Sequence, residues 1–577
     1  MAIDPASNLP ETEPLDTVPP EFDQELNEGT LPPPKTLGGI LRQLGPGLVV
    51  AGSIVGSGEL IATTKTGAQA GIALLWLIVV GCLIKVFVQI ELGRYSICNG
   101  ETTLNALNRV PGRMGPANWI IWFWFFMMLA GIAQLGGIVG GVGQSLAIAI
   151  PFTGDYREAI AVPEQSEIAS YLAWTEILNS ETVELTDVPE EELTRIQLGH
   201  KRIGDALGEL GERGTQALEA VKAGETLKDP HTWDDKFWAL IVGLITVALL
   251  YNGRYSVIQN ISTVLVIAFT FITIGNVASL QMTKEWALSW DDIATGFSFG
   301  LPKTGYNWDS LASSEVLSRW GETLKTGDKW DSLATALATF GIIGVGATEL
   351  ITYPYWCIEK GYARYTGKRT NDEDWVTRAR GWMKVMHYDA FLSMVVYTIA
   401  TMAFFVMGVA VLYREGRDPG GMRMVSTLAS AYVPVFGTYA KWLFLGGAIA
   451  VLYSTFLVAN AGHSRMYTDA MKIFGFIPRN DQKAHDRTLT TFCVVLPILC
   501  VALHWTGIDP ASAVLLSGMM QATMLPMIGL GALYFRYTST DPRLAPSKLW
   551  DLMLILSFLG LLVAGVWGVY LQIQKLL

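Results

Sequence analysis

Long apolar segments separated by shorter polar ones dominate the chain from residue 37 onward. A helix needs roughly 20 predominantly apolar residues to cross the hydrocarbon core of a bilayer, which is about 30 Å thick. On this basis we predict eleven membrane-spanning helices: Gly39–Gln69, Gly71–Tyr95, Asn118–Ile150, Phe237–Tyr251, Ser256–Gln281, Ser332–Tyr362, Gly381–Tyr413, Tyr439–Met471, Leu489–Trp505, Ala511–Tyr537 and Leu549–Gln574. The first ten would form two sets of five, and the last would stand outside the repeat.

One short frame occurs in both the first and the sixth segment. The pattern V-G-x-x-E-L-I is found at Val55–Ile61 and at Val345–Ile351. Small, weakly helix-forming residues followed by a carboxylate disfavour a continuous helix in the middle of an apolar segment. We therefore predict that both helices are unwound, near Gly56–Gly58 and Gly346–Thr352, and that they lie side by side. Interrupted hydrophobic segments at corresponding positions of two halves indicate the binding site of an inverted-repeat transporter.

The composition agrees with a membrane protein. Hydrophobic residues make up 51% and charged residues 16% of the 577 positions, which is typical of a polytopic membrane protein. The net charge of −11 is concentrated in the N-terminal tail and one insert, so it does not indicate a nucleic-acid partner. We find no nucleophile–base pair, nucleotide-binding loop or metal-hydrolase motif, so the sequence predicts neither an enzyme nor a cofactor.

Charge and hydropathy divide the chain into four regions. We predict a disordered cytoplasmic tail at 1–36, spans one to three at 37–150, an acidic extracytoplasmic helical insert at 151–235, and spans four to eleven at 236–577. Lys and Arg gather in the loops after even-numbered spans, which places those loops in the cytoplasm. The expected protein therefore lies in the plasma membrane, with its N-terminus inside and its C-terminus outside.

Ionisable side chains inside a bilayer are costly and are functional by default. Five stand out within the predicted spans: Glu59, Lys65, Lys85, Glu349 and Asp389. Lys85 is far from either end of its span, so it needs a carboxylate, and Glu59 or Glu349 would serve in a structural or gating salt bridge. We expect Lys65 to reach water and Asp389 to lie at a helix terminus.

The order of several short motifs resembles the Nramp family of divalent-metal transporters, over most of the chain from Gly45 to the end of span ten. The matching landmarks are Gly45-Pro46-Gly47-Leu48, Thr66-Gly67-Ala68-Gln69, Leu74-Leu75-Trp76, Gly346-Ala347-Thr348 and Leu525-Pro526. The resemblance implies the LeuT-type fold, in which two inverted repeats of five helices each begin with a broken helix.

The chain departs from this family at the residues that carry its chemistry. The family's first-helix motif Asp-Pro-Gly-Asn falls on Gly56-Ser57-Gly58-Glu59, so Gly56 replaces the metal-binding Asp and Glu59 the Asn. The sixth-helix motif Met-Pro-His falls on Leu350-Ile351-Thr352, which removes the thioether that favours soft transition metals. The acidic pair tied to proton transfer falls on Gln134 and Gly137, neither of which can relay a proton.

These observations define a predicted site around the two breaks. Its substrate-binding residues are Gly56, Ser57, Gly58, Glu59, Ala347, Thr348, Glu349 and Thr352. Glu59 and Glu349 are the expected metal ligands and would face one another, while Lys85 and Gln134 would serve in coupling or gating.

The predicted function is a secondary transporter of a divalent metal cation, by alternating access around the broken helices. An all-oxygen set of ligands prefers hard cations such as magnesium or manganese. Two alternatives stay open. One is a carrier of a small organic solute, such as an amine or amino acid, whose ammonium a carboxylate would bind. The other is a receptor or scaffold that uses the acidic insert.

Overall fold

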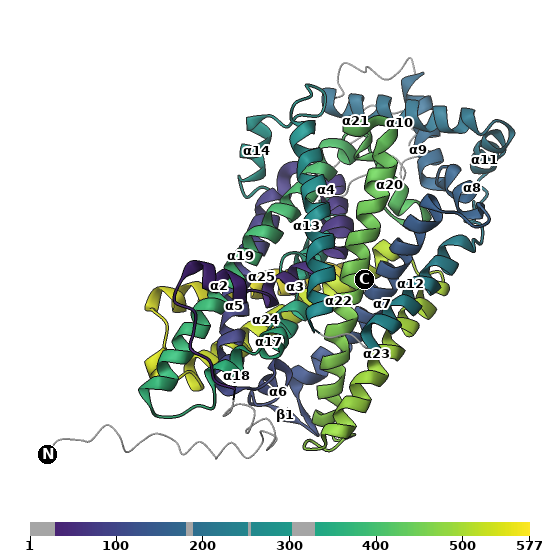
Figure 1. Ribbon diagram of the computed structural model, residues 1–577. Helices are drawn as coiled ribbons and strands as arrows, with labels where there is room; N and C mark the ends of the chain where they lie inside the picture. The colour runs from purple at the N-terminus through teal and green to yellow at the C-terminus, as the bar shows by residue number, and fades with distance from the viewer. Residues whose placement is uncertain (1–28, 180–188, 252–254, 303–328, 577) are drawn as a thin grey trace.

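A computed structural model describes residues 29–179, 189–251, 255–302 and 329–576. Within these ranges the protein is a bundle of long helices (Figure 1). The strands β1 (Arg113–Met114) and β2 (Ala117–Asn118) form a short antiparallel hairpin, in which Arg113 pairs with Asn118 and Met114 with Ala117. The described part of the chain is therefore all-α apart from this hairpin, as the apolar segments predict.

The helices follow the two sets of five. The first set comprises α3 (Pro46–Ile54) with the π-helix η1 (Ser57–Thr63) and α4 (Thr64–Ala70), then α5 (Leu75–Asn99), α7 (Trp119–Ala149), α12 (Asp234–Tyr251) and α13 (Tyr255–Leu280). The second set comprises α16 (Lys329–Ile342) with α17 (Ala347–Lys360), then α19 (Glu373–Met407) continued by the π-helix η5 (Gly408–Tyr413), α22 (Ala440–Ile473), α23 (Gln482–Trp505) and α24 (Pro510–Thr538). The last helix, α25 (Lys548–Leu576), follows both sets.

By length and composition, nine helical stretches of the described chain are apolar enough to cross a membrane, or up to ten if the bent pair α2 (Leu37–Gln43) and α3 is one span. One of the nine, Gly58–Asn99, has 42 residues. At 1.5 Å per residue it is about 63 Å long, enough to cross the core twice, and it turns at Gly71, where φ is +60°. The fourth predicted span, Phe237–Tyr251, corresponds to α12, which is absent from the nine because the helix starts three residues earlier, with two aspartates and a lysine. The nine stretches therefore correspond to the eleven predicted spans, because Gly58–Asn99 contains parts of two of them and α12 is a further one.

The packing of the helices follows a two-fold relation between the sets. The third helix of each set packs against the fifth helix of the other set: α7 against α24, and α22 against α13. The two broken helices are in contact through both halves, α3 with α17 and α4 with α16. Since each set has an odd number of helices, the second set starts from the opposite face, so the repeat is inverted.

Short elements cover the two ends of the bundle (Figure 1). At the lower end of the view lie the hairpin, α6 (Thr103–Leu107) and α18 (Tyr362–Thr366). The helix α2 and the 3₁₀ turn η8 (Pro542–Leu544) both pack against α19. The upper end carries η2 (Gly71–Leu74), α14 (Trp290–Gly296), η6 (Gly421–Arg423), α20 (Met424–Ser430), α21 (Val433–Phe436) and η7 (Gly437–Tyr439). The insert after α7 lies at this end as α8 (Asp155–Ala161), α9 (Gln165–Leu178), α10 (Glu190–Glu209) and α11 (Glu212–Lys222), and it has an apolar cluster of its own.

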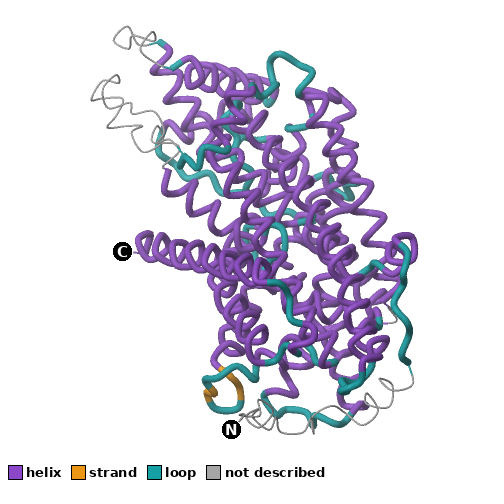
Figure 2. Tube along the Cα trace, turned by 90° about the vertical axis from the view of Figure 1, so that its left-hand side faces the viewer, coloured by secondary structure: helices purple, strands orange, loops and turns teal. Residues whose placement is uncertain are grey.

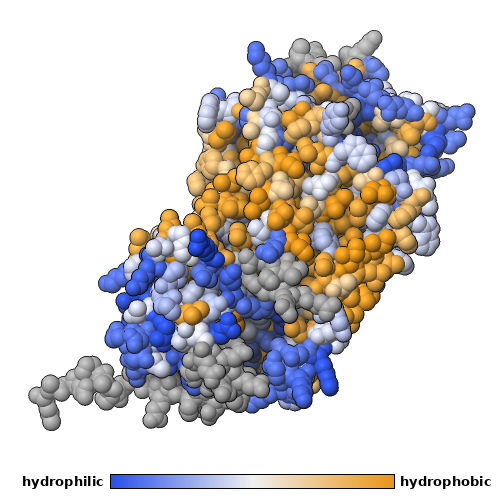
Figure 3. All heavy atoms as spheres, in the orientation of Figure 1, coloured by the Kyte–Doolittle hydropathy of each residue, from blue (hydrophilic) through white to orange (hydrophobic). Residues whose placement is uncertain are grey.

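The surface agrees with a protein whose solvent is lipid. A wide hydrophobic belt runs around the middle of the visible face, and hydrophilic residues gather at both ends (Figure 3). The hairpin, which carries Arg113, and the segment with Lys472 and Arg479 at the end of α22 lie together at the lower end (Figure 1); that this end is cytoplasmic stays a prediction. Figure 2 shows the C-terminal end of α25 projecting from the side of the bundle.

The start of the described chain is held against the helices. The backbone N–H of Leu31 donates to the carbonyl of Tyr365 at 3.1 Å, and the carbonyl of Leu31 accepts from the indole of Trp382 at 3.0 Å. Leu31 lies within the predicted tail at 1–36 and is held by these two hydrogen bonds. Residues 1–28 of the predicted tail lie outside the described residues.

Candidate functional site

The first broken helix is interrupted where a neighbouring helix comes close. α3 ends at Ile54, residues 55 and 56 turn, and η1 begins at residue 57. A Cβ on Gly56 would lie 1.8 Å from Oγ1 of Thr455 in α22, and a Cβ on Gly58 would lie 3.1 Å from the carbonyl oxygen of Ile342. Glycine is required at the first position because a side chain has no room there. The break is at the predicted place, although residues from 57 onward are π-helical rather than unwound.

The sixth-span break lies earlier than predicted. α16 ends at Ile342, and the chain is non-helical until α17 begins at Ala347. The left-handed conformation falls on Gly344, with φ of +56°, a value that glycine tolerates. The N–H of Leu350 then donates to the carbonyl of Gly346 at 2.9 Å and closes the first turn of α17. Residues 347–352 are therefore helical, and the prediction that they are unwound is wrong.

Each frame glutamate contacts the broken helix of the opposite repeat. Oε1 of Glu59 accepts from the N–H of Gly344 at 3.2 Å and from the hydroxyl of Thr401 at 3.0 Å. Oε1 of Glu349 accepts from the hydroxyl of Ser53, in the last turn of α3, at 3.1 Å. Glu59 is fully buried, and its Oε2 has no hydrogen-bond partner among the described residues. The site thus holds two carboxylates, with one buried oxygen whose hydrogen-bonding capacity is unused.

Lys85 has a different partner from the predicted one. Its ammonium donates to the carbonyl oxygens of Phe340 at 2.5 Å and Ile343 at 2.8 Å, and it lies 4.7 Å from the centre of the Phe340 ring. These carbonyls are at the C-terminal end of α16, where no intrahelical N–H follows and the helix dipole favours a cation. No ion pair between described residues joins Lys85 to Glu59 or Glu349, so the expectation that Lys85 needs a carboxylate partner is wrong.

Gln134 belongs to a polar chain that ends at α17. Its Oε1 accepts from the hydroxyl of Ser517 at 2.7 Å and from Nε2 of Gln521 at 3.1 Å, both in α24. Oε1 of Gln521 in turn accepts from the backbone N–H of Thr348 at 3.2 Å, in the first turn of α17. Sequence reasoning did not identify Gln521 or Thr401. A single polar residue in an apolar span does not show, from the sequence alone, which distant group it will bind.

Three further predicted site residues differ in what they offer a ligand. The hydroxyl of Thr352 donates to the carbonyl of Thr348 at 3.0 Å, so its hydrogen is used within α17. Ala347 is buried in the same turn and supplies backbone alone. The side chain of Ser57 lies outside the described residues.

The other two intramembrane ionisable residues are structural. Oδ1 of Asp389 accepts from the N–H of Gly45 at 2.9 Å and Oδ2 from the N–H of Gly47 at 2.5 Å, which caps the N-terminal end of α3. The expectation of a helix-terminus role holds for α3, but Asp389 itself lies in the interior of α19 and not at the start of its own span. Lys65 forms a 2.5 Å ion pair with Asp418, whose side chain is half exposed.

The side-chain oxygens at the breaks include the carboxylates of Glu59 and Glu349 and the hydroxyls of Ser53 and Thr401. The thiol of Cys82 also lies close, 3.3 Å from where a Cβ on Gly344 would stand. Within the part of the chain that the structure describes, no group of three or more His, Cys, Asp or Glu side chains is placed to hold a metal. A cation here would therefore depend on two carboxylates, with hydroxyl, backbone or water oxygens completing its shell.

Comparison with known proteins identifies a family for the second half of the chain. Residues 322–573 match the family model described as "Natural resistance-associated macrophage protein-like". This range contains the sixth span and extends into the last helix, and within it the match confirms the resemblance predicted from Gly346-Ala347-Thr348 and Leu525-Pro526. No curated protein sequence matches the chain.

Several solved transporter structures cover most of the chain at low identity. A manganese transporter from Eremococcus coleocola, in complex with an aromatic bis-isothiourea compound, is 14% identical over 94% of this chain and 97% of its own, with a TM-score of 0.46. MhsT in complex with L-phenylalanine is 14% identical over 92% and 97%, with a TM-score of 0.43. Mhp1, a nucleobase-cation-symport-1 family transporter, is 13% identical over 92% of each chain, with a TM-score of 0.41. These likenesses are too distant to assign a substrate.

Proposed function

We propose that this chain, which is Nramp-like over residues 322–573, is a secondary transporter that moves a divalent metal cation by alternating access around its two broken helices. The supporting observation is the reciprocal placement of Glu59 and Glu349. Glu59 contacts the interruption of the second repeat through Gly344. Glu349 contacts Ser53 in the last turn of α3, just before the interruption of the first repeat. A ligand held by both glutamates would therefore sense the relative position of the two repeats.

Electrostatics favour a doubly charged substrate. Two carboxylates held in a low-dielectric site repel one another, and a buried charge without a partner is costly. Lys85 does not neutralise them directly, because its ammonium is bound to the carbonyls at the end of α16. A divalent cation bound between Glu59 and Glu349 would neutralise both charges at once.

The ligand chemistry favours a hard cation. The hydrogen bonds described at the two glutamates come from hydroxyl and backbone N–H groups. Oxygen donors suit magnesium, calcium and manganese, whereas thioether and thiolate donors select softer metals. We therefore propose magnesium or manganese as the substrate rather than a soft transition metal.

A small organic cation is the second candidate. It is favoured because no group of three or more His, Cys, Asp or Glu side chains among the described residues is placed to hold a metal. A primary ammonium has three N–H donors and needs fewer ligands than a metal. A carrier for an amine or amino acid would use the same two carboxylates.

The polar chain from Gln134 links substrate binding to helix movement in this proposal. Gln134 and Gln521 connect α7 and α24 to the N–H of Thr348, one residue before Glu349. Neither glutamine side chain can exchange a proton near neutral pH. We therefore assign Gln134 a gating role through Gln521, and not the role of a proton relay.

Uptake by proteoliposomes tests the proposal. Wild-type protein should take up manganese or magnesium saturably, and Glu59→Gln and Glu349→Gln should each reduce uptake by at least tenfold, because each removes a charged oxygen ligand. Glu219→Gln is the matched control. It is the same substitution at an exposed position of the insert, and uptake should be unchanged.

Two results would contradict the metal assignment. Normal metal uptake by both glutamine variants would show that the glutamates are not its ligands. If an organic amine stabilises the wild type while no divalent ion does, the second candidate replaces the first. A thermal-shift comparison of the same variants distinguishes loss of binding from loss of folding.

A further inference from the structure

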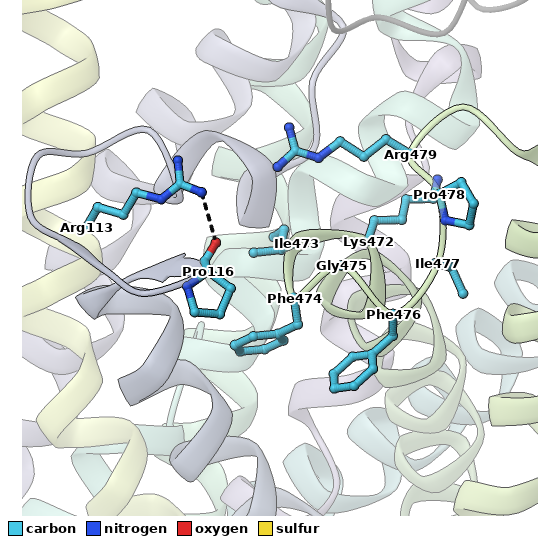
Figure 4. A pocket seen from close by; sticks show the side chains of 10 residues that line it. All are labelled: Arg113, Pro116, Lys472, Ile473, Phe474, Gly475, Phe476, Ile477, Pro478 and Arg479. Carbon is cyan, nitrogen blue, oxygen red and sulfur yellow. Dashed lines mark hydrogen bonds between the residues drawn. The ribbon is translucent and has the colours of Figure 1, made fainter.

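A cavity of about 610 Å³ opens at the lower end of the bundle (Figure 4). One wall is the β1–β2 hairpin, which contributes Arg113. The other is the C-terminal end of α22 and the loop after it, which contribute Lys472 and Arg479. Figure 4 shows the side chains of Arg113 and Arg479 extending towards one another from opposite walls. Segments that are far apart in the sequence thus bring three cationic groups to one cavity.

The positive charge of this cavity is uncompensated by its own walls. None of its lining residues is acidic. Arg113 is oriented by two backbone carbonyls, since its Nε donates to Gly115 at 3.1 Å and its Nη2 to Pro116 at 3.5 Å. Among the described residues, no hydrogen bond or ion pair is formed by the head groups of Lys472 and Arg479. Such a group of donors, with one arginine already oriented, suits a phosphate oxyanion.

Aromatic residues place the cavity at the level of lipid headgroups. The Trp122 ring at the start of α7 packs edge-on against the Phe474 ring, which lines the cavity, with centroids 5.0 Å apart. Phe476, in the same wall, is 73% exposed, and Met114 at the tip of the hairpin is 59% exposed. Tryptophan and other aromatic side chains gather where hydrocarbon meets water. The hairpin lies at the end of the bundle, below the hydrophobic belt (Figures 1 and 3).

We propose that this cavity binds the phosphate headgroup of an anionic glycerophospholipid. Arg113, Lys472 and Arg479 would hold the phosphate, and the exposed ring of Phe476 would lie against the start of an acyl chain. The apolar rim favours a lipid over free phosphate, because a soluble anion gains nothing from an exposed phenyl ring. This site is separate from the one at the helix breaks, and it does not depend on the proposed substrate.

Binding of a short-chain lipid to the purified full-length protein tests the proposal. Dioctanoyl-phosphatidylglycerol should raise the thermal midpoint saturably, and dioctanoyl-phosphatidylcholine should not. Each Lys or Arg near an anionic membrane surface contributes enough to change affinity about fivefold. The double variant Lys472→Gln/Arg479→Gln should therefore bind phosphatidylglycerol about 30-fold more weakly.

A matched double variant controls for general charge. Lys483→Gln/Arg487→Gln removes two exposed cations from the beginning of α23, outside the cavity lining, and should change affinity less than threefold. Equal weakening by both double variants would overturn the proposal in favour of non-specific surface attraction. If inorganic phosphate or glycerophosphate stabilises the wild type as strongly at the same concentration, the occupant is a soluble anion and the lipid assignment is wrong. Unchanged phosphatidylglycerol affinity in Lys472→Gln/Arg479→Gln would also overturn it.

Discussion

Replacing Lys85 with methionine separates the contact found in the structure from the salt bridge that the sequence suggested. Methionine keeps much of the side-chain volume and removes the donors to Phe340 and Ile343. A buried carbonyl that loses its donor costs about 1–3 kcal/mol. Burying the ammonium itself carries a desolvation penalty, and methionine removes it. This gain offsets part of the cost of leaving the two carbonyls without a donor. We expect Lys85→Met to lower the free energy of unfolding by about 2 kcal/mol, and Lys85→Gln, which keeps an N–H donor, to lower it by less.

A double-mutant cycle with Glu59→Gln gives the decisive comparison, measured by equilibrium unfolding in mixed micelles. Because Lys85 and Glu59 share no direct contact, the two losses should add to within about 1 kcal/mol. Breaking one side of a buried ion pair costs about 3–5 kcal/mol and leaves the other charge unpaired, so removing both partners would recover much of that loss. Recovery of stability in Lys85→Met/Glu59→Gln would refute the assignment of Lys85 to the end of α16.

Two further substitutions probe the fold around the site and at its lower end. Gly56→Ala should cost about 1–3 kcal/mol of stability and reduce uptake, because the new Cβ would collide with Thr455. The control is Gly208→Ala, whose Cβ would have open space around it. In a thermal-unfolding comparison this control should lose no stability. A hydrogen bond from Arg543 lowers the pKa of the Asp541 carboxyl from its ordinary 3.8 to about 2. Because the pKa is lowered in the folded state, the ionised carboxylate stabilises the fold above about pH 4, and this stabilisation is lost as the pH falls towards 2. Asp541→Asn should therefore lower stability by about 1 kcal/mol at pH 7, and the thermal midpoints of variant and wild type should converge below pH 3.

The membrane-spanning pattern and the broken helices could be predicted because they depend on local sequence. Runs of apolar residues determine the spans, and the two frames beginning at Val55 and Val345 mark the interruptions to within a few residues. The position of the second break was misplaced because Gly344 and Gly346 are equivalent candidates in the sequence. The close packing of neighbouring helices then decides which glycine adopts the left-handed conformation.

The partners of buried polar groups could not be predicted, because they come from distant parts of the chain. Lys85 finds backbone carbonyls that exist only because α16 ends inside the protein. Thr401 binds Glu59 across 342 positions of sequence. A sequence shows that an intramembrane charge needs a partner, but it does not show that the end of another helix will provide one.

The central claim is that Glu59 and Glu349 bind one divalent cation together. Crystals grown with manganese, measured near the manganese absorption edge, would locate the ion directly. The account predicts one anomalous peak between the two carboxylates, at oxygen distances of roughly 2.0–2.6 Å, and no peak there in crystals of Glu59→Gln. Manganese bound elsewhere while this position stays empty would contradict it.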